Sequence, residues 1–520
     1  MMGIWLKDTV SKIASYIEGM EHPLVKLILL GLIIRFVLTP ILTFNIDMGY
    51  WTHVIGVFEN GFGLYGTAGY YYTPIWGYIL GAVMFIGDTI GMADMGTFLD
   101  PLASMINDEF KVSDFVTSIP FNISVKLPLI LTDLATGILI YKLVYRWTES
   151  NVKSSLAFFL WFLSPLVITE SSVHGTFDNF SVMFTLLTIL FCLDRKYTIA
   201  GAAFAIAIFT KFFPIFFIFF LIALVLKQEG ADRNGAKNLG KAVIGAVIAS
   251  VVIYLPNIAR GEFWDSLYFL AYRMGISRET LSGIGTTSTI VILAVATVMV
   301  IGILWIISKY GNRIIYALKG KKRTVAKVLA ITAGLLIIAY AFKLVVALIT
   351  GDTSSFESVG MAIVTMITIF SVFLELYLAY RLLIIDDPTD EQIITIMMLS
   401  ALAILLWPTA PSYVLILFPF VMIYACCVDG RYIGPTIAVS VFVALGEITA
   451  YVVSLTSFSL YTGLIDISVM IGGFEFLLNP SFLIVPGSWI LDAPVVVMSY
   501  LSVLYVSYKW YKGYLRGDPQ

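Results

Sequence analysis

Hydrophobic positions along the chain fall into long runs that recur from residue 24 to residue 508. Most runs are about as long as the roughly 20 residues that a helix needs to cross a hydrocarbon core of about 30 Å. The runs predict transmembrane helices near residues 24–42, 121–145, 154–171, 177–193, 198–210, 212–226, 242–256, 288–308, 325–350, 359–383, 392–406, 412–428, 433–455 and 488–508. The pattern therefore predicts an all-α, polytopic transmembrane helical bundle of about 14 spans.

Two apolar segments do not fit a span. Residues 1–23 place apolar side chains at helical spacing between lysines, which predicts a cytoplasmic amphipathic helix at the membrane interface. Residues 74–87 form a run shorter than a span, which favours an interfacial or re-entrant segment.

Loop charges decide between the possible topologies. If 74–87 does not cross, the loops on one side hold most of the loop lysines and arginines, and the other side holds only Lys111, Arg260, Arg273 and Arg278. If it crosses, the bias reverses for all later loops. Because positive loops stay cytoplasmic, we place both termini inside and residues 43–120 in one long extracytoplasmic loop that contains interfacial helices.

The same argument divides residues 198–226 into two half-length helices that meet at Lys211-Phe212-Phe213-Pro214. Pro214 breaks a helix, and an ammonium at membrane depth is costly unless it faces a polar cavity. We therefore expect Lys211 to line such a cavity.

Composition agrees with a membrane protein, since 59% of residues are hydrophobic and 13% are charged, against roughly 25% charged in soluble domains. The formal net charge of −2 and the lack of a basic block give no sign of a nucleic-acid partner.

Asp47 follows the first span directly and is the leading candidate for chemistry. A carboxylate in this position is often only a solvated helix end. However, a glycine- and aromatic-rich stretch follows it, and such residues either anchor a protein at the interface or form a wall for a sugar. The side chains predicted to contact the substrate there are Tyr50, His53, Tyr65, Tyr71 and Tyr72.

A second cluster lies in the short turn SSVHGTFDNF between the third and fourth spans. Asp178 can serve as a helix N-cap there, but that role leaves His174 unexplained. The spacing matches no metal motif, so no cofactor is predicted, and a divalent metal is possible but not favoured. Asp133, inside the second span, is either functional or one half of a buried pair, with Lys211 or a helix end as the partner.

Arg273 and Arg278 stand out in the predicted outer loop 257–287, because the outer loops contain few cations. A guanidinium suits a lipid phosphate, whereas the alternative is a solvated loop helix with exposed arginines.

Together these residues resemble the GT-C glycosyltransferases. The shared order is an acidic residue in the first outer loop, G-x-x-x-Y-x-Y-Y-Y-T-P, a span with D-L-x-T-x-x-L, H-G-x-F-D at a helix start, and a broken helix with K-F-F-P. The chain looks closest to the dolichyl-phosphate-mannose-dependent mannosyltransferases, including those of GPI-anchor synthesis. It departs from their D-x-D pattern, because Asn45 precedes Asp47 by two residues. The W-W-D-Y-G signature of oligosaccharyltransferases is absent.

The resemblance implies an enzyme that moves a hexose, mannose by preference, from a polyprenyl- or dolichyl-phosphate sugar to an acceptor hydroxyl on a glycan or lipid-linked glycan. Asp47 would be the single base of an inverting transfer, and His174, Asp178, Lys211, Arg273 and Arg278 would contact the substrate. Residues 24–226 would form the catalytic module and residues 227–520 a variable module. The alternatives are a transporter or flippase of a lipid-linked or small polar substrate, and a non-catalytic subunit of a glycosylation complex. The membrane would be that of a prokaryotic cell, an archaeon by preference, or the ER.

Overall fold

The computed structural model describes residues 12–43, 45–59, 63–65, 70–89, 96–98, 115–268, 283–349, 355–405, 414–454, 461–462 and 465–466. These residues are nearly all helical, which confirms the all-α prediction. Besides the connecting turns, the described residues form two short antiparallel strand pairs, β1 (Gly96–Phe98) with β2 (Phe115–Thr117) and β3 (Tyr461–Thr462) with β4 (Ile465–Asp466). The predicted span 488–508 and the interfacial residues 1–11 lie outside the described residues.

The chain divides into two compact units that interleave along the sequence. Unit 1 comprises Met1–Tyr70, Trp76–Met183 and Ala410–Gln520, and unit 2 comprises Tyr71–Ile75 and Phe184–Thr409. The predicted division at residue 226 is a different one, between a catalytic and a variable module, and it stays a prediction.

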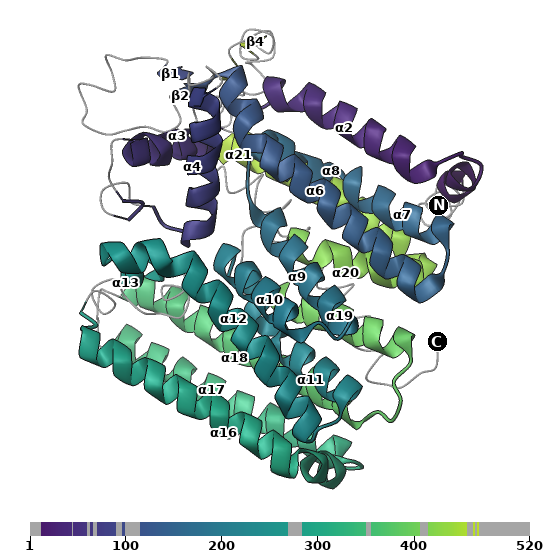
Figure 1. The fold of residues 1–520 in the computed structure, drawn as a ribbon, viewed down its shortest axis with the longest axis vertical. Helices are drawn as coiled ribbons and strands as arrows, with labels where there is room; N and C mark the ends of the chain where they lie inside the picture. The colour runs from purple at the N-terminus through teal and green to yellow at the C-terminus, as the bar shows by residue number, and fades with distance from the viewer. Residues whose placement is uncertain are drawn as a thin grey trace. The chain divides into compact units, whose positions relative to one another are not determined.

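Unit 1 contains helices from both ends of the chain (Figure 1). They are α2 (Pro23–Ile41), α3 (Asn45–Glu59), α4 (Pro74–Thr89, but for its first two residues), α6 (Ile119–Thr148), α7 (Asn151–Phe162), α8 (Pro165–Ile168), the π-helix η2 (Thr169–His174), α20 (Val414–Cys427), η5 (Gly430–Tyr432) and α21 (Ile433–Ser454). Helix α9 (Asp178–Leu193) begins in unit 1 and continues into unit 2.

Unit 2 contains the middle of the chain. Its helices are α10 (Tyr197–Thr210), the 3-10 helix η3 (Phe213–Phe217), α11 (Ile218–Glu229), α12 (Arg233–Arg260), α13 (Phe263–Ser266), α16 (Thr286–Leu318), α17 (Lys322–Ile349), α18 (Ser355–Ile384) and α19 (Asp390–Leu405).

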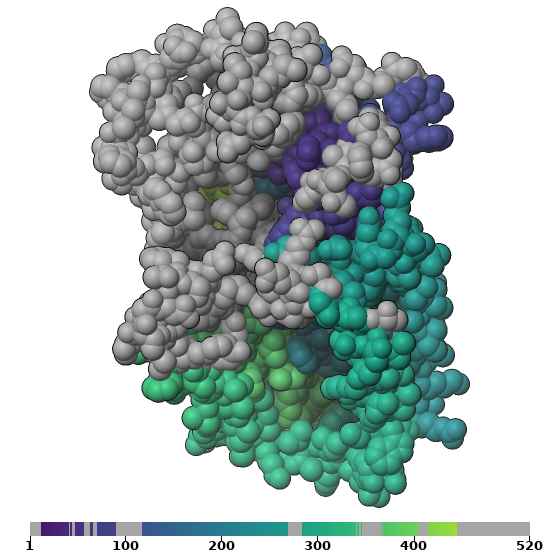
Figure 2. Space-filling model, turned by 90° about the vertical axis from the view of Figure 1, so that its left-hand side faces the viewer, coloured from purple at the N-terminus to yellow at the C-terminus, as the bar shows by residue number. Residues whose placement is uncertain are grey.

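Several helices can cross a bilayer by length and apolar composition. Among the described residues these are α2, α6, α12 and α16, and α7 together with α8 and η2 has the length and composition of one broken span or of a re-entrant loop. The predicted number of about 14 spans stays a prediction. Helix α16 exposes apolar side chains along its length, such as Val298 at 68%. Exposed apolar side chains of this kind suit contact with lipid. Figure 2 shows unit 2 as the teal and green atoms in the lower part of the view.

Helices α10 and α11 form the predicted broken pair. They contain 14 and 12 residues, so each rises only about 20 Å, less than a bilayer core. Tyr197, the first residue of α10, donates a 2.7 Å hydrogen bond to Glu229, the last residue of α11. The two helices are therefore antiparallel, and their tip is the predicted break at Lys211–Pro214. Both outer ends of this re-entrant hairpin lie on one side, as the charge argument required.

Other cation-rich loops of unit 2 gather at that same end. The Lys227 ammonium donates to the carbonyl of Ile385, and Lys319 pairs with Asp386 at 2.5 Å. The loops after α11, α16 and α18 therefore share one end of the unit, which agrees with the predicted grouping of their charges.

The predicted first outer loop contains helices, as expected. Helix α4 has 16 residues, and both α3 and α4 run oblique to α2 and α6 (Figure 1). The stretch after Asp47 is helix α3, so the glycine- and aromatic-rich wall begins beyond it.

Candidate functional site

The third span of unit 1 is broken within the protein. Helix α7 ends at Phe162, Pro165 starts the four-residue helix α8, and the π-helix η2 follows directly. All six residues of η2 are buried, and all but Val173 carry hydroxyl or ionisable side chains, which are Thr169, Glu170, Ser171, Ser172 and His174. Short π-helices are frequent at functional sites, and irregular backbone at membrane depth needs protein or a wet cavity beside it.

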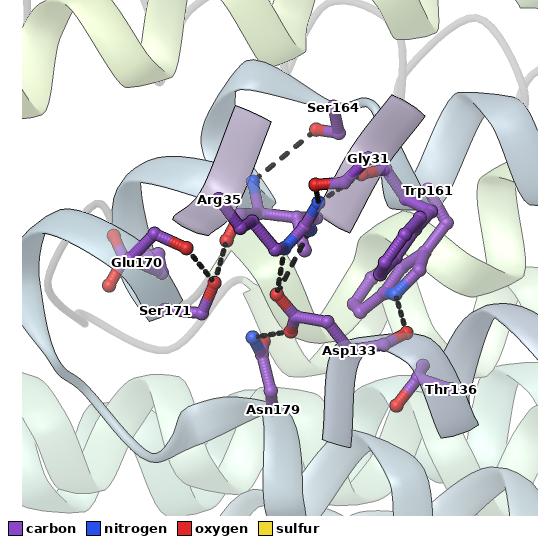
Figure 3. Close-up of polar contacts among 12 residues, drawn as sticks. Gly31, Arg35, Asp133, Thr136, Trp161, Ser164, Glu170, Ser171 and Asn179 are labelled. Atoms are coloured by element: carbon purple, nitrogen blue, oxygen red, sulfur yellow. Dashed lines mark hydrogen bonds and ion pairs between the residues drawn. The ribbon is translucent and has the colours of Figure 1, made fainter. Parts of the chain in front are cut away.

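A buried ion pair holds this break in place (Figure 3). Arg35 of α2 donates to Asp133 Oδ2 from Nε at 3.2 Å and from Nη2 at 3.0 Å, and both side chains are fully buried. Asp133 also accepts from Nδ2 of Asn179 on α9, while the Trp161 indole donates to the Asp133 carbonyl at 3.0 Å. Asp133 is thus the acid of a buried pair, and its partner is Arg35 on the first span.

Arg35 also caps a helix end. Its Nη1 donates to the carbonyl of Phe162 at 2.5 Å and its guanidinium lies 4.1 Å from the Phe162 ring centroid. Phe162 is the last residue of α7, where carbonyls lose their intrahelical partners. The pair therefore ties together α2, α6, the end of α7 and the start of α9.

Lys126 is a second buried cation on α6. Its ammonium donates to the carbonyls of Thr39 at 3.3 Å and Leu42 at 2.7 Å, and to the Thr43 hydroxyl at 3.2 Å. It therefore satisfies the free carbonyls at the end of α2. The pairing of Arg35 with Asp133 was not predicted from the sequence, which suggested Lys211 or a helix end as the partner, and no role was predicted for Lys126. The available signal was a charge within or beside an apolar run.

The turn after η2 packs against α3. Gly175 has φ +76°, and its amide donates to the Glu170 carbonyl at 3.0 Å. The Trp51 indole of α3 donates to the Gly175 carbonyl at 3.2 Å, and a Cβ on Gly175 would lie 2.6 Å from the sulfur of Met48. The first turns of α3, which carry the half-buried Asp47, therefore rest on the turn that directly follows His174, the last residue of η2.

Glu170 is a site residue that the sequence analysis missed. It is fully buried, and its Oε2 accepts a 2.6 Å hydrogen bond from Thr176. Its Oε1 has no hydrogen-bond partner within the described part of the chain, and His174 Nδ1 lies 3.8 Å away. The signal was an acidic residue inside the third span, four residues before His174. Asp178, which was predicted, is buried as the first residue of α9.

The predicted aromatic contacts divide between the two units. In unit 1, the ring of half-buried Tyr50 lies 5.2 Å from Trp51, and that of buried Tyr65 lies 5.6 Å from Tyr70. His53 is half-buried on α3.

In unit 2, the Lys211 ammonium lies 4.7 Å from the ring centroid of Tyr72, and Tyr71 packs against both Tyr72 and Tyr268. Thr73 donates to the Phe209 carbonyl, so residues 71–73 sit on the tip of the re-entrant hairpin. The structure thus brings Tyr71, Tyr72 and Lys211 together. Arg273 and Arg278 lie outside the described residues.

Within the described ranges, no group of three or more His, Cys, Asp or Glu side chains is arranged to hold a metal ion. That no metal is required stays a prediction.

Two comparisons bear on identity. Residues 54–275, less than half of the chain, match a protein family described as GPI transamidase subunit PIG-U. GPI mannosyltransferase 1 of Saccharomyces cerevisiae is 29% identical over 92 residues, which are 18% of this chain and 22% of that relative. The match thus spans less than a quarter of the relative's length. Both similarities agree with a GT-C-like membrane protein, and both names refer to GPI.

Proposed function

We propose that the chain binds a polyprenyl- or dolichyl-phosphate sugar beside the turn at Gly175 and transfers a hexose to an acceptor hydroxyl. One observation carries the proposal: α3, which has Asp47 in its first turn, is joined by the Trp51 hydrogen bond to Gly175, which directly follows the π-helix that contains Glu170 and His174. A carboxylate, an imidazole and a buried acid are thereby gathered at one broken span. Mannose remains the preferred sugar because of the mannosyltransferase similarity.

The chemistry needs one base. Asp47 would take the proton of the acceptor hydroxyl as its oxygen attacks the anomeric carbon, while the bond to phosphate breaks and the lipid phosphate leaves as a stable anion. The configuration at that carbon inverts. His174, whose Nδ1 lies 3.8 Å from Oε1 of Glu170, would donate a hydrogen bond to the departing anion, and preorganised contacts of this kind are worth about 3 kcal/mol when dry.

The test is a transfer assay on the purified chain with a short-chain polyprenyl-phosphate mannose. Asp47→Asn should lower turnover at least about 100-fold, the usual scale of general-base loss. Asp88→Asn, which removes an exposed carboxylate from α4, is the matched control. Near-wild-type turnover by Asp47→Asn would remove Asp47 from the catalytic role.

A second candidate is a non-catalytic subunit that binds a lipid-linked glycan. The match to the PIG-U family favours it, because that match begins at residue 54 and leaves Asp47 outside. Donor binding without transfer, unaffected by Asp47→Asn, would select this role. Movement of the donor between leaflets of a vesicle would instead select the flippase alternative. For either role we propose an ER-type membrane, on the basis of the GPI-related similarities.

A further inference from the structure

Three helices of unit 2 leave an apolar groove between them. The groove has a volume of about 230 Å³ and is lined from α11, α16 and α18 by Phe219, Ile222, Ala223, Ile314, Ile315, Leu318, Leu376, Ala379, Tyr380, Leu383 and Ile384. An apolar cavity of about 150 Å³ already holds a benzene ring, so this groove has room for a length of hydrocarbon chain. Ile314 is 44% exposed, so the groove opens to the outside of the unit.

The lining admits hydrocarbon and little else. Its one polar side chain, Tyr380, donates its hydroxyl to the Leu318 carbonyl at 3.0 Å, so that group is already satisfied. A polar ligand in the groove would lose its hydrogen bonds to water without replacement, which is costly.

One end of the groove is cationic on all three helices. Lys227 follows the lining residue Ala223 by one turn of α11, Lys319 directly follows Leu318 of α16, and Arg381 directly follows Tyr380 of α18. The contacts of Lys227 with Ile385 and of Lys319 with Asp386 show that these ends meet.

The turn after α16 extends this positive charge. It reads Lys319-Gly320-Lys321-Lys322-Arg323, and all five residues are exposed. Asp386 and Asp387 lie opposite, but the cations of the three helix ends and the turn outnumber them. From Phe219 to Lys227 the helix rises about 12 Å, so hydrocarbon gives way to positive charge over that distance.

We propose that the groove binds one acyl chain of an anionic phospholipid whose phosphate lies among Lys227, Lys319 and Arg381. The order of apolar lining and then cations matches the order of tail and headgroup in such a lipid. Basic pockets between membrane helices at the positive side of a membrane recognise anionic headgroups in this way. The bound lipid would join α16 to α11 and α18. This proposal is independent of the proposed transfer activity.

The headgroup is tested by native mass spectrometry of the full chain, titrated with phosphatidylglycerol or phosphatidylcholine in detergent. Wild type should retain phosphatidylglycerol preferentially, and Lys319→Gln with Arg381→Gln should weaken it about fivefold per cation removed. Arg431→Gln, which removes a cation from unit 1, is the control and should leave the retention of phosphatidylglycerol unchanged. Equal retention of both lipids, or no effect of the double variant, would overturn the proposal.

The tail is tested separately by filling the groove. Ile314→Trp should reduce phosphatidylglycerol binding, while Val298→Trp, at an exposed position of the same helix outside the groove, should not. Ile314 is partly exposed, so this variant should still fold, and elution as a monodisperse peak confirms it. Soluble glycerol phosphate at the same concentration should not compete. Competition by glycerol phosphate, or equal binding by both tryptophan variants, would exclude the groove as the site of the tail.

Discussion

The buried pair of Arg35 and Asp133 gives the sharpest test of the fold. Asp133→Asn leaves the guanidinium charged and buried, whereas Arg35→Met leaves the carboxylate with Asn179 as its side-chain donor. Each single variant should therefore lose about 3–5 kcal/mol of the free energy of unfolding, the usual result of breaking a buried pair.

The double variant Arg35→Met with Asp133→Asn removes both charges. The double variant still leaves the carbonyl of Phe162 without its partner, and such a buried group costs about 1–3 kcal/mol of the free energy of unfolding. The free energy of unfolding lost in the double variant should therefore be smaller, by at least about 2 kcal/mol, than the sum of the losses in the two single variants.

The assay is denaturant unfolding in mixed micelles, followed by tryptophan fluorescence and helical circular dichroism. The pair of Lys319 and Asp386, exposed at 42% and 75%, is the matched control and should show no measurable coupling. Single losses below about 1 kcal/mol, or losses that simply add, would refute the claim that this pair holds the broken span.

Four further predictions follow from single contacts. Gly201→Val should lower the free energy of unfolding by at least about 3 kcal/mol, because a Cβ there would lie 1.8 Å from the Ala242 carbonyl oxygen and force α10 away from α12. Gly302 has open space around it, so Gly302→Val is the control and should be tolerated. Equal losses of the free energy of unfolding in the two variants would contradict this prediction. Tyr197→Phe should cost about 1.5–3 kcal/mol through loss of the bond to Glu229 at the base of the hairpin, with Tyr145→Phe unchanged in the same unfolding assay. Gly175→Ala should impair donor binding because φ is +76° and Met48 blocks a Cβ, whereas Gly56→Ala should not; binding equal to wild type would separate the turn from the site. The hydrogen bond from Arg431 lowers the pKa of the Asp429 carboxyl. This contact therefore stabilises the fold slightly above the ordinary carboxyl pKa of about 3.9, and the stabilisation is lost as pH falls through the lowered pKa. When melting temperatures are measured between about pH 6 and pH 3, Arg431→Gln should lack the part of the decrease that comes from this contact.

Much of the architecture was predictable because the bilayer constrains it. The length of an apolar run specifies a helix, and the loop charges specify which ends lie together. The break at Lys211–Pro214 is a clear case, since Pro214 and the charge parity demanded two antiparallel half-helices before Tyr197 and Glu229 were seen to meet. The helices α3 and α4 of the first outer loop were expected only as interfacial elements, without bounds.

The candidate site was predictable only in part. His174 and Asp178 were predicted because polar residues at a span boundary are conspicuous, and their role stays a prediction. Lys211 lies at the break with its ammonium 4.7 Å from the Tyr72 ring, and its predicted contact with the substrate stays a prediction as well. Glu170 was missed because one acid inside an apolar run has no neighbour along the sequence that reveals its partner.

By itself the sequence determined that this protein is an all-helical membrane protein, that residues 198–226 are broken into two half-length helices, and that the loops after α11, α16 and α18 share one end of unit 2. Only the tertiary structure decided that Arg35 pairs with Asp133, that Asn179 completes the pair, and that α3 rests on the turn after η2. The physical reason is that burial of a charge demands a partner without specifying which one. That choice depends on how helices far apart in the chain pack together.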